Sequence, residues 1–450
     1  MRRVTYIILL FSALMSCSAA GPARQQEEQE EVFSYDYRDL GDSLLLARYD
    51  FLDIATDTLI DPAGTMINAY RKLQTIERLG PDSVAQCFTI VHYGDSHIQA
   101  GTLTETARVR FQKRFGNAGR GMIIPHRLTR SNEPRDYRVK SPNTWEYVRI
   151  IQPEATGNVG AGGLGIRSRE ETQIFMIQTL ATEDSLDYRF NRVVVFHDSL
   201  APMITVAESM LADIGDADTV YNFLTELDLS VATDSAILYT YKEPPFTDGA
   251  FYGFSLENGN SGVLYHSLGI NGACFLHWGR SPEIIQQSRA MGPDLIIVSL
   301  GSNEAAGRNF IESVFYDQID SFVGALRRAN PGSAILLTTP PEAMRRARRS
   351  ASPNRNFERV RQTILDYAAD NSMAVFDLYA ITGGENSSRI WEKENMLTRD
   401  KIHYTPEGYT LQGVLLYQAF MNGFRNYANP PAAPGATGDE AAATDTLTSE

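Results

Sequence analysis

Apolar residues follow two different patterns along the chain. In the first pattern, unbroken apolar runs of strand length alternate with longer amphipathic segments, and the runs lie at 87–93, 263–270, 294–301, 334–341 and 373–379. A strand that is apolar along its whole length is typical of a parallel sheet with both faces covered. Strands that alternate with helices therefore predict a doubly wound, three-layer α/β domain of the flavodoxin-like kind.

The second pattern fills the middle of the chain. Between about 130 and 262, short runs rich in Val, Ile, Thr, Tyr and Phe are separated by turn clusters such as TGNVGAGG and ENGNSG. Many short strands at regular spacing predict an antiparallel β-sandwich. We expect this sandwich, at 129–262, to be inserted into the α/β domain, which 41–128 and 263–428 would form.

The N-terminus has the features of an export signal. A basic MRR is followed by an apolar segment and by LMSC at 14–17, which resembles the lipobox of bacterial lipoproteins. Residues 1–17 would then be the signal peptide with its lipobox, cleaved before Cys17, which would be lipidated and become the first residue; an ordinary signal peptide cut after Ala20 is the alternative. We expect an acidic tether at 18–40 and a Pro/Ala-rich acidic tail at 429–450, neither of which can form a core.

Charge and cysteine content narrow the possible partners. The formal net charge of −14 offers no basic stripe for a nucleic acid. Seven histidines and three cysteines include no HExxH and no paired CxxC, so we expect no metal and no cofactor. Cys87 opens one predicted strand and Cys274 follows the carboxyl end of another, which predicts two separate buried thiols rather than a disulfide. The sequence indicates no oligomeric state.

Polar clusters stand where four of these predicted elements meet loops. GDSH (94–97), GINGA (269–273) and GSNEA (301–305) follow strands, and DKIHYTPEGY (400–409) precedes the last helix. Active sites of open α/β sheets collect at the carboxyl ends of the strands. The chemistry of ester cleavage suits these residues: Ser96 as nucleophile, His403 as base and Asp400 to orient the base.

Ester cleavage also needs donors for the developing oxyanion. Ser96 opens a predicted helix and can offer its own N–H, Gly272 can offer a backbone N–H, and Asn303 can offer a side-chain N–H. Each residue alone is more typical of a helix cap or a turn. The ordered appearance of Ser96, Gly272 and Asn303 at three strand ends, with His403 on the loop before the last helix, favours a catalytic set.

In these blocks the chain resembles the SGNH (GDSL-type) hydrolases. Ser96, Gly272, Asn303 and His403 match the four family blocks, and Asp400 completes the triad. GDSH and FGNAGRGMIIP place the resemblance in a branch that includes bacterial peptidoglycan O-acetylesterases and related O-acetyltransferases with an inserted β-sandwich. Gly101, where relatives often carry an acidic residue, and Ser302, where threonine is usual, depart from the pattern without touching the triad.

The remaining polar and aromatic candidates have two interpretations each. His97 is a helix-starting residue bonded within the fold or a pocket residue, and Glu304 is a similar candidate for substrate binding. In the insert, the aromatic side chains are expected in the core, with stacking on sugars as the alternative; they include Trp145, Tyr147 and Phe175.

The resemblance implies an exported, periplasmic or outer-membrane esterase that removes O-acetyl groups from a cell-envelope glycan, with peptidoglycan first. Its partners would be that acetylated glycan and, through the lipid anchor, a membrane. Three alternatives remain open: a polysaccharide O-acetyltransferase of the same fold, a plant-polysaccharide acetylesterase, and a non-catalytic glycan-binding lipoprotein.

Overall fold

The computed structural model describes residues 37–79, 83–182, 186–212, 221–241, 249–347 and 350–429. The predicted signal segment with Cys17, almost all of the tether and the tail beyond 429 lie outside the described residues. The chain divides into two compact units, Met1–Leu44 and Leu45–Glu450. The first contributes the start of helix α1 (Tyr37–Leu46), and the second contains the remaining elements.

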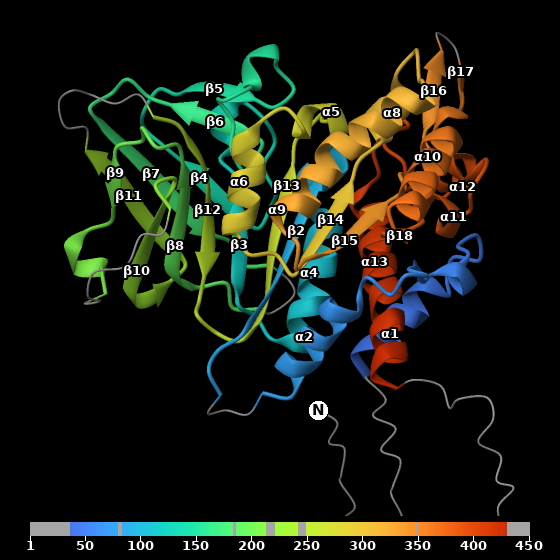
Figure 1. Ribbon diagram of the computed structural model, residues 1–450, viewed down its shortest axis with the longest axis horizontal. Coiled ribbons are helices and arrows are strands. Elements are labelled where there is room, and N and C mark those ends of the chain that lie inside the picture. Colours follow the sequence, from blue (N-terminus) through green and yellow to red (C-terminus); the bar gives the residue numbers. More distant parts are fainter. Residues whose placement is uncertain are drawn as a thin grey trace, which may run out of the picture. The chain divides into compact units, whose positions relative to one another are not determined.

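A six-stranded sheet forms the centre of the α/β part (Figure 1). Its strand order is β1-β18-β15-β14-β2-β13, and every neighbouring pair is parallel except β1 with β18. The strands are β1 (Leu59–Ile60), β2 (Cys87–Gly94), β13 (Gly262–Gly269), β14 (Leu295–Ser299), β15 (Ala334–Thr338) and β18 (Ala374–Phe376). In chain order the parallel strands follow 2-1-3-4-5, which is the flavodoxin-like arrangement expected from the sequence.

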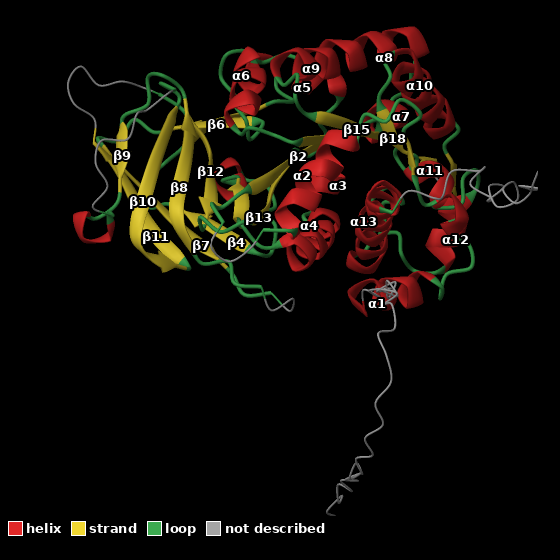
Figure 2. Ribbon diagram, turned by 60° about the horizontal axis from the view of Figure 1, so that its bottom comes forward, coloured by secondary structure: helices red, strands yellow, loops and turns green. Residues whose placement is uncertain are grey.

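Helices cover both faces of this sheet (Figure 2). One face packs on α2 (Ile67–Glu77), α4 (Thr102–Phe115) and α13 (Pro406–Ala428). The other packs on α5 (Phe275–Trp278), α6 (Pro282–Ala290), α8 (Glu312–Ile319), a π-helical turn (Asp320–Gly324), α9 (Ala325–Ala329) and α10 (Asn356–Asp370). Ile90 points to the first core and its neighbour Val91 to the second, so both faces need apolar side chains. This two-sided burial explains the unbroken apolar runs.

The inserted segment forms two antiparallel sheets, as predicted. One has the order β10-β8-β12-β6-β5, and the other has the order β4-β7-β11-β9. Phe175 on β7 contacts Phe251 and Phe254 on β12, with ring centroids 5.2 and 5.1 Å apart, so the sheets share a core. The strands are β4 (Tyr137–Lys140), β5 (Glu146–Arg149), β6 (Leu164–Arg167), β7 (Thr172–Thr179), β8 (Phe190–His197), β9 (Met203–Thr205), β10 (Leu224–Thr233), β11 (Ser235–Tyr241) and β12 (Phe251–Glu257).

A strand that the sequence did not predict joins the two parts. β3 (Gly119–Ile123) pairs with β12 of the sandwich, and the Met122 N–H donates to His266 Nδ1 on β13 at 3.2 Å. The core of the sandwich is continuous with the core on one face of the central sheet. The insert therefore packs against the α/β part. In the chain it lies between the first and second parallel strands, β2 and β13, which pair directly with each other.

Other sequence expectations have direct outcomes. Cys87 and Cys274 are both free thiols, although each is partly exposed. Phe175 is fully buried and Trp145 stacks on it at 4.8 Å, which confirms core packing for both. The sequence did not predict the edge strand β1 or the hairpin of β16 (Met344–Ala347) and β17 (Ser350–Pro353). Among the described helices, none has the length and apolarity needed to cross a bilayer.

Candidate active site

Ser96 lies at the junction between β2 and the short helix α3 (Ser96–Gln99). Asp95 caps this helix, because its Oδ1 accepts the His97 N–H at 2.9 Å. A side chain at Gly94 would collide with Ile98, so glycine is required where the strand turns into the helix. As the first helical residue, Ser96 has no intrahelical acceptor for its N–H, which can serve an oxygen in the site.

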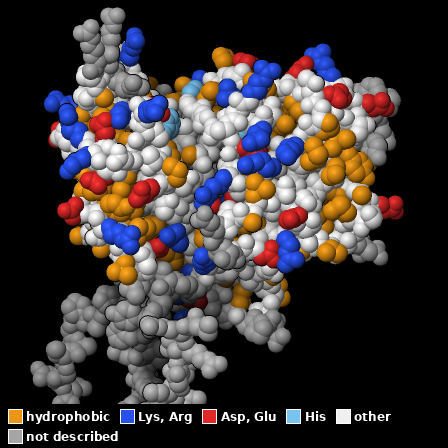
Figure 3. All heavy atoms as spheres, turned by 180° about the vertical axis from the view of Figure 1, so that it is seen from behind, with side chains coloured by type: hydrophobic (Ala, Val, Ile, Leu, Met, Phe, Trp, Pro, Cys, Tyr) orange, Lys and Arg blue, Asp and Glu red, His pale blue; other side chains and the backbone are white. Residues whose placement is uncertain are grey.

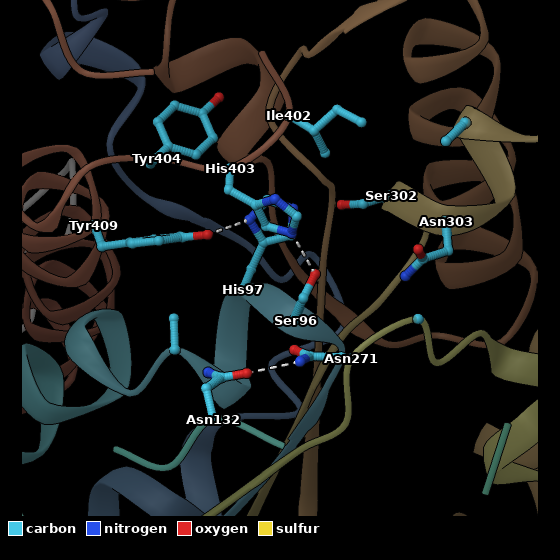
Figure 4. Close-up of a pocket in the computed structure, with 13 residues that line it drawn as sticks. Ser96, His97, Asn132, Asn271, Ser302, Asn303, Ile402, His403, Tyr404 and Tyr409 are labelled. Carbon is cyan, nitrogen blue, oxygen red and sulfur yellow. Dashed lines mark hydrogen bonds between the residues drawn. The ribbon is translucent and has the colours of Figure 1, made fainter. Parts of the chain in front are cut away.

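The structure brings Ser96, His403 and Asp400 together. Figure 4 shows Ser96 and His403 facing each other in the pocket. Ser96 Oγ lies 2.8 Å from His403 Nε2, and His403 Nδ1 lies 2.8 Å from Asp400 Oδ2. This is the nucleophile–base–carboxylate arrangement of acyl-transfer sites. The side chains of His403 and Asp400 keep 38% and 46% of their surface exposed, so the pair borders solvent.

A tight loop fixes Asp400 for this contact. Its Oδ1 accepts the N–H groups of Ile402 and His403 at 2.8 and 2.9 Å and the Thr398 hydroxyl at 2.9 Å. Burial acts to raise the pKa of Asp400, but the hydrogen bonds from His403, Ile402 and Thr398 outweigh it and hold that pKa well below its usual range. Asp400 therefore stays ionised at every working pH.

The three predicted oxyanion donors have different surroundings. Gly272 lies in the pocket wall with φ of +79°, a conformation that favours glycine. Within the described residues no hydrogen bond uses its N–H. Asn303, in α7 (Ser302–Ala306), also lines the pocket, but its Nδ2 donates to Ala273 O at 2.9 Å and to Asp95 Oδ2 at 3.3 Å. Asn303 therefore uses its side-chain N–H groups within the fold, and it must release one of these contacts to reach an oxyanion.

These residues line one pocket of about 520 Å³. Around it stand Ser96, His97, Ala100, Asn132, Asn271, Gly272, Ser302, Asn303, Ala306, Ile402, His403, Tyr404 and Tyr409. The pocket sits at the carboxyl ends of β2, β13 and β14 and receives the His403 loop from the segment before α13. This volume accommodates one sugar ring with its substituents.

Both interpretations of His97 apply: it is hydrogen-bonded within the fold, and it is a pocket residue. It lines the pocket, and its Nδ1 lies 3.0 Å from the Tyr409 hydroxyl. The His97 and His403 ring centroids are 5.3 Å apart. Burial, with a smaller effect from His403, lowers the pKa of His97 to about 3. His97 is therefore neutral and adds no second positive charge beside the base.

Glu304 is not among the residues that line the pocket. Its Oε1 accepts the Phe275 N–H at 2.8 Å at the start of α5. Burial raises the pKa of Glu304 to about 7. The structure thus gives it a contact that orders the segment after Gly272 rather than the contact with substrate that the sequence suggested.

Sequence reasoning missed the opposite wall of the pocket. Asn132, from the loop that leads into the sandwich, accepts a hydrogen bond from Asn271 Nδ2 at 2.7 Å. Tyr409, on α13, was not singled out either. Within the described residues, no group of three or more His, Cys, Asp or Glu side chains is placed to hold a metal ion.

Comparison with known proteins agrees with this geometry. Residues 241–411 match the model of the GDSL-like Lipase/Acylhydrolase family. The match includes Gly272, Asn303, Asp400 and His403, and Ser96 lies before it. No curated protein sequence matches the chain.

Among solved structures, a peptidoglycan O-acetylesterase matches 82% of this chain and 99% of its own, with a TM-score of 0.67 and 21% identity. A lipase/acylhydrolase from Enterococcus faecalis matches 36% of this chain and 77% of its own, with a TM-score of 0.28 and 19% identity. An acetyl xylan esterase matches 35% of this chain and 81% of its own, with a TM-score of 0.28 and 16% identity.

The chain therefore has the fold of the SGNH (GDSL-type) hydrolases with an inserted antiparallel sandwich. Its resemblance to the peptidoglycan O-acetylesterases, predicted from the sequence, is confirmed by the fold. The family match supports an acylhydrolase, which is an ester-cleaving enzyme.

Proposed function

We propose that this protein is an exported serine esterase that removes O-acetyl groups from a cell-envelope glycan, with peptidoglycan as the first candidate. The observation that carries the proposal is the contact chain from Ser96 Oγ through His403 to Asp400, with 2.8 Å at each step. The similar peptidoglycan O-acetylesterase structure supports the choice of substrate.

In the first half of the proposed reaction, Ser96 Oγ attacks the acetyl carbonyl carbon and passes its proton to His403 Nε2. The carbonyl oxygen becomes an oxyanion, which the N–H groups of Ser96 and Gly272 and the Asn303 amide would stabilise. When the intermediate collapses, the bond to the sugar oxygen breaks, and His403 returns its proton to that oxygen. The deacetylated glycan leaves, and Ser96 carries the acetyl group.

In the second half, water loses a proton to His403 Nε2 and attacks the acetyl-Ser96 carbonyl carbon. Collapse breaks the bond to Ser96 Oγ, which regains the proton, and acetate leaves. Throughout both halves Asp400 holds the imidazole in the tautomer that accepts at Nε2 and stabilises the imidazolium. An O-acetyltransferase would follow the same course with a sugar hydroxyl in place of water.

Exposed arginines on segments that border the pocket would suit an anionic glycan. Asn354 and Asn356 both donate to Ala305 O beside the pocket, and Met344 N–H donates to Lys401 O in the His403 loop. On these bordering segments, exposed arginines form no ion pair with a described residue; they are Arg308, Arg345, Arg355 and Arg399. Figure 3 shows Lys and Arg side chains gathered at the end that carries β16 and β17 (upper left). Peptidoglycan carries carboxylates on its peptides, whereas xylan backbones are neutral.

Export and anchoring are part of the proposal. The LMSC segment supports lipidation of Cys17, and the predicted acidic segment 18–40 would then act as a tether. Replacing Cys17 with serine should release the protein from membranes into the soluble fraction. Unchanged fractionation would contradict the anchor, while leaving the esterase proposal standing.

The test of the activity is acetate release by the protein lacking residues 1–17. O-acetylated peptidoglycan, acetylated xylan and 4-nitrophenyl acetate are compared, with Ser96→Ala as the inactive control. We expect acetate from peptidoglycan at a higher kcat/KM than from xylan. Acetyl transfer to an added glycan in place of acetate release would identify the transferase. Binding of glycan with no turnover of any ester would identify the glycan-binding alternative.

A further inference from the structure

The side-chain amide of Asn303 is held by two oxygen atoms inside the fold. Its Nδ2 donates to Ala273 O at 2.9 Å and to Asp95 Oδ2 at 3.3 Å. An amide nitrogen carries two hydrogen atoms, so both are in use before a substrate arrives. Figure 4 shows this amide on the pocket wall, on the side that faces Ser96. Stabilising an oxyanion at Ser96 therefore requires that one of the two bonds opens.

The two acceptors differ in what they can do. Ala273 O is a backbone carbonyl oxygen, which accepts at every pH and lies at the shorter distance. Because it only accepts, it also disfavours a flipped amide, whose oxygen would then face it. Asp95 Oδ2 belongs to a carboxyl group, which is a pure acceptor when ionised and carries a proton when neutral. The state of Asp95 therefore decides how firmly the second N–H of Asn303 is bound.

The contacts of Asp95 indicate where that proton lies. Oδ1 accepts the His97 N–H at 2.9 Å, which leaves Oδ2 as the oxygen that carries the proton of the neutral carboxyl. A protonated oxygen accepts more weakly than a carboxylate oxygen, whose hydrogen bonds are charge-assisted. The neutral carboxyl therefore gives up the Asn303 N–H more easily than the carboxylate does. The carboxylate would also place a negative charge beside the oxyanion, which opposes its formation.

The groups around Asp95 favour its neutral form. Within the described residues no Lys or Arg forms an ion pair with this carboxyl, which is 1% exposed. Burial raises the pKa of Asp95 to about 7, opposed by the His97 N–H and reinforced by the carboxyl of Glu304 on α7. Two other titratable groups sense its charge, the Cys274 thiol before α5 and the Tyr409 hydroxyl on α13, and burial raises the pKa of both. Both therefore stay neutral and supply no compensating charge.

We propose that Asp95 is a positioning residue for the oxyanion site: its neutral carboxyl releases Asn303 to the oxyanion, and its carboxylate withdraws Asn303. The set of oxyanion donors is then complete when Asp95 is neutral and lacks one donor when Asp95 is ionised. The N–H groups of Ser96 and Gly272 remain in both states, so ionisation slows turnover without abolishing it. This inference rests on the proposed esterase function and deepens it by naming how pH regulates the same site.

The test is the pH dependence of kcat/KM for 4-nitrophenyl acetate between pH 6 and pH 9, with spontaneous hydrolysis subtracted. This parameter reports the titrating groups of the free enzyme. For the wild type we expect a fall of about tenfold per pH unit above pH 7, toward a level roughly 100-fold lower, because one oxyanion donor is lost. Protonation of His403 lowers activity as pH falls, so it cannot cause a loss as pH rises.

Three variants make the result specific. Asp95→Asn does not titrate, so its kcat/KM should not fall over this range, whatever its absolute value. Asn303→Ala has no donor to withdraw, so it should show a low kcat/KM with no further fall. Glu304→Gln removes a neighbouring negative charge that raises the pKa of Asp95, so the fall should begin at lower pH. Asp317→Asn, at an exposed aspartate on α8, is the matched control and should keep the wild-type profile.

The outcomes separate this inference from the proposed function. A flat wild-type profile, or a fall that persists in Asp95→Asn, would overturn the role of Asp95 and leave the esterase standing. If Asp95→Asn fails to fold by thermal unfolding, an unmoved fall in Glu304→Gln overturns it instead. No turnover of the ester at any pH would overturn the esterase proposal and this inference with it.

Discussion

Ser96 Oγ lies 2.8 Å from His403 Nε2, although 307 residues separate the two in the chain. Ser96 is placed by the end of the first parallel strand, and His403 by the loop that precedes the last helix. The whole inserted sandwich lies between them in sequence. The contact therefore exists only when the central sheet and α13 are correctly assembled, which ties activity to the fold.

Replacing either partner tests this relationship. Ser96→Ala removes the nucleophile, and His403→Ala removes the base, so each should lower kcat/KM for 4-nitrophenyl acetate by roughly 10⁴-fold or more. The double variant should be little worse than either single one, because the two residues act as a unit. Losses that multiply in the double variant would show that Ser96 and His403 act independently.

A covalent probe checks the same assignment without substrate. A fluorophosphonate should label Ser96 in the wild type, as read by mass spectrometry, and should fail to label the His403→Ala variant. The reason is that an unactivated serine hydroxyl is a weak nucleophile. Labelling at a different serine would move the active site elsewhere.

Asp400→Asn addresses the orientation of His403. The asparagine oxygen can still accept the N–H groups of Ile402 and His403, so the loop should keep its shape. Its amide nitrogen would then face His403 Nδ1 and favour the tautomer that cannot accept a proton at Nε2. We expect kcat to fall by roughly 10²–10⁴-fold with KM nearly unchanged. A rise in KM alone would indicate a damaged pocket and not a wrong tautomer.

Much of this architecture could be predicted from the sequence, for physical reasons. Strands that are buried on both faces have unbroken apolar runs such as 87–93. The residue types needed for catalysis stand at the carboxyl ends of the predicted strands, where parallel sheets place their active sites. β3 escaped prediction because GRGMI is short and contains Gly119 and Gly121, both with positive φ. A glycine-rich segment has no strand propensity of its own, and pairing with β12 makes it a strand.

The features that the sequence did not predict depend on contacts between loops that are distant in the chain. The pairing of Asn132 with Asn271 depends on where the chain re-enters after β3, and no local pattern encodes it. Glu304 was a candidate for substrate binding because it stands next to Asn303, yet its carboxylate turns to the Phe275 N–H. Sequence order gives the element on which a residue lies, and packing decides which side of that element faces the pocket.

Trp145 should matter for stability and not for glycan recognition. It stacks on Phe175 at 4.8 Å and packs against the core of the sandwich. Trp145→Ala should therefore lower the free energy of unfolding by about 2–4 kcal/mol, measured in urea. Its turnover of polymer and of 4-nitrophenyl acetate should fall by the same factor. A loss confined to the polymer would instead support the sugar-stacking interpretation.

A buried cluster of Asp136 with Arg108 and Arg120 gives a further stability test. Asp136 Oδ2 lies 2.7 Å from Arg108 and its Oδ1 lies 3.0 Å from Arg120, and no side chain of the three exceeds 3% exposure. Asp136→Asn would leave two buried guanidiniums without their counter-charge. We expect a loss of about 3–5 kcal/mol of unfolding free energy, measured in urea. A loss below about 1 kcal/mol would show that solvent reaches the cluster.

The raised pKa of Asp95 should make the free energy of unfolding depend on pH. Its carboxyl is 1% exposed, and burial, opposed by the His97 N–H and reinforced by Glu304, raises its pKa to about 7. In the unfolded chain the pKa of an aspartate is about 3.9. Between these values the folded protein keeps a proton that the unfolded chain has released. The free energy of unfolding should therefore fall as pH rises from about 4 to 7, by at most about 1.4 kcal/mol per pH unit from this group.

Asp95→Asn isolates that contribution, because asparagine does not titrate. Any packing cost of the substitution shifts the whole stability curve, whereas only the carboxyl changes its slope. Urea unfolding at steps between pH 4 and pH 8 should show the variant gaining on the wild type as pH rises, with the gain ending near pH 7. Asp50→Asn, at an exposed aspartate, is the matched control and should run parallel to the wild type. If the Asp95→Asn curve also runs parallel, Asp95 is ionised in the folded protein from low pH, and its negative charge then stands beside Asn303 throughout the reaction.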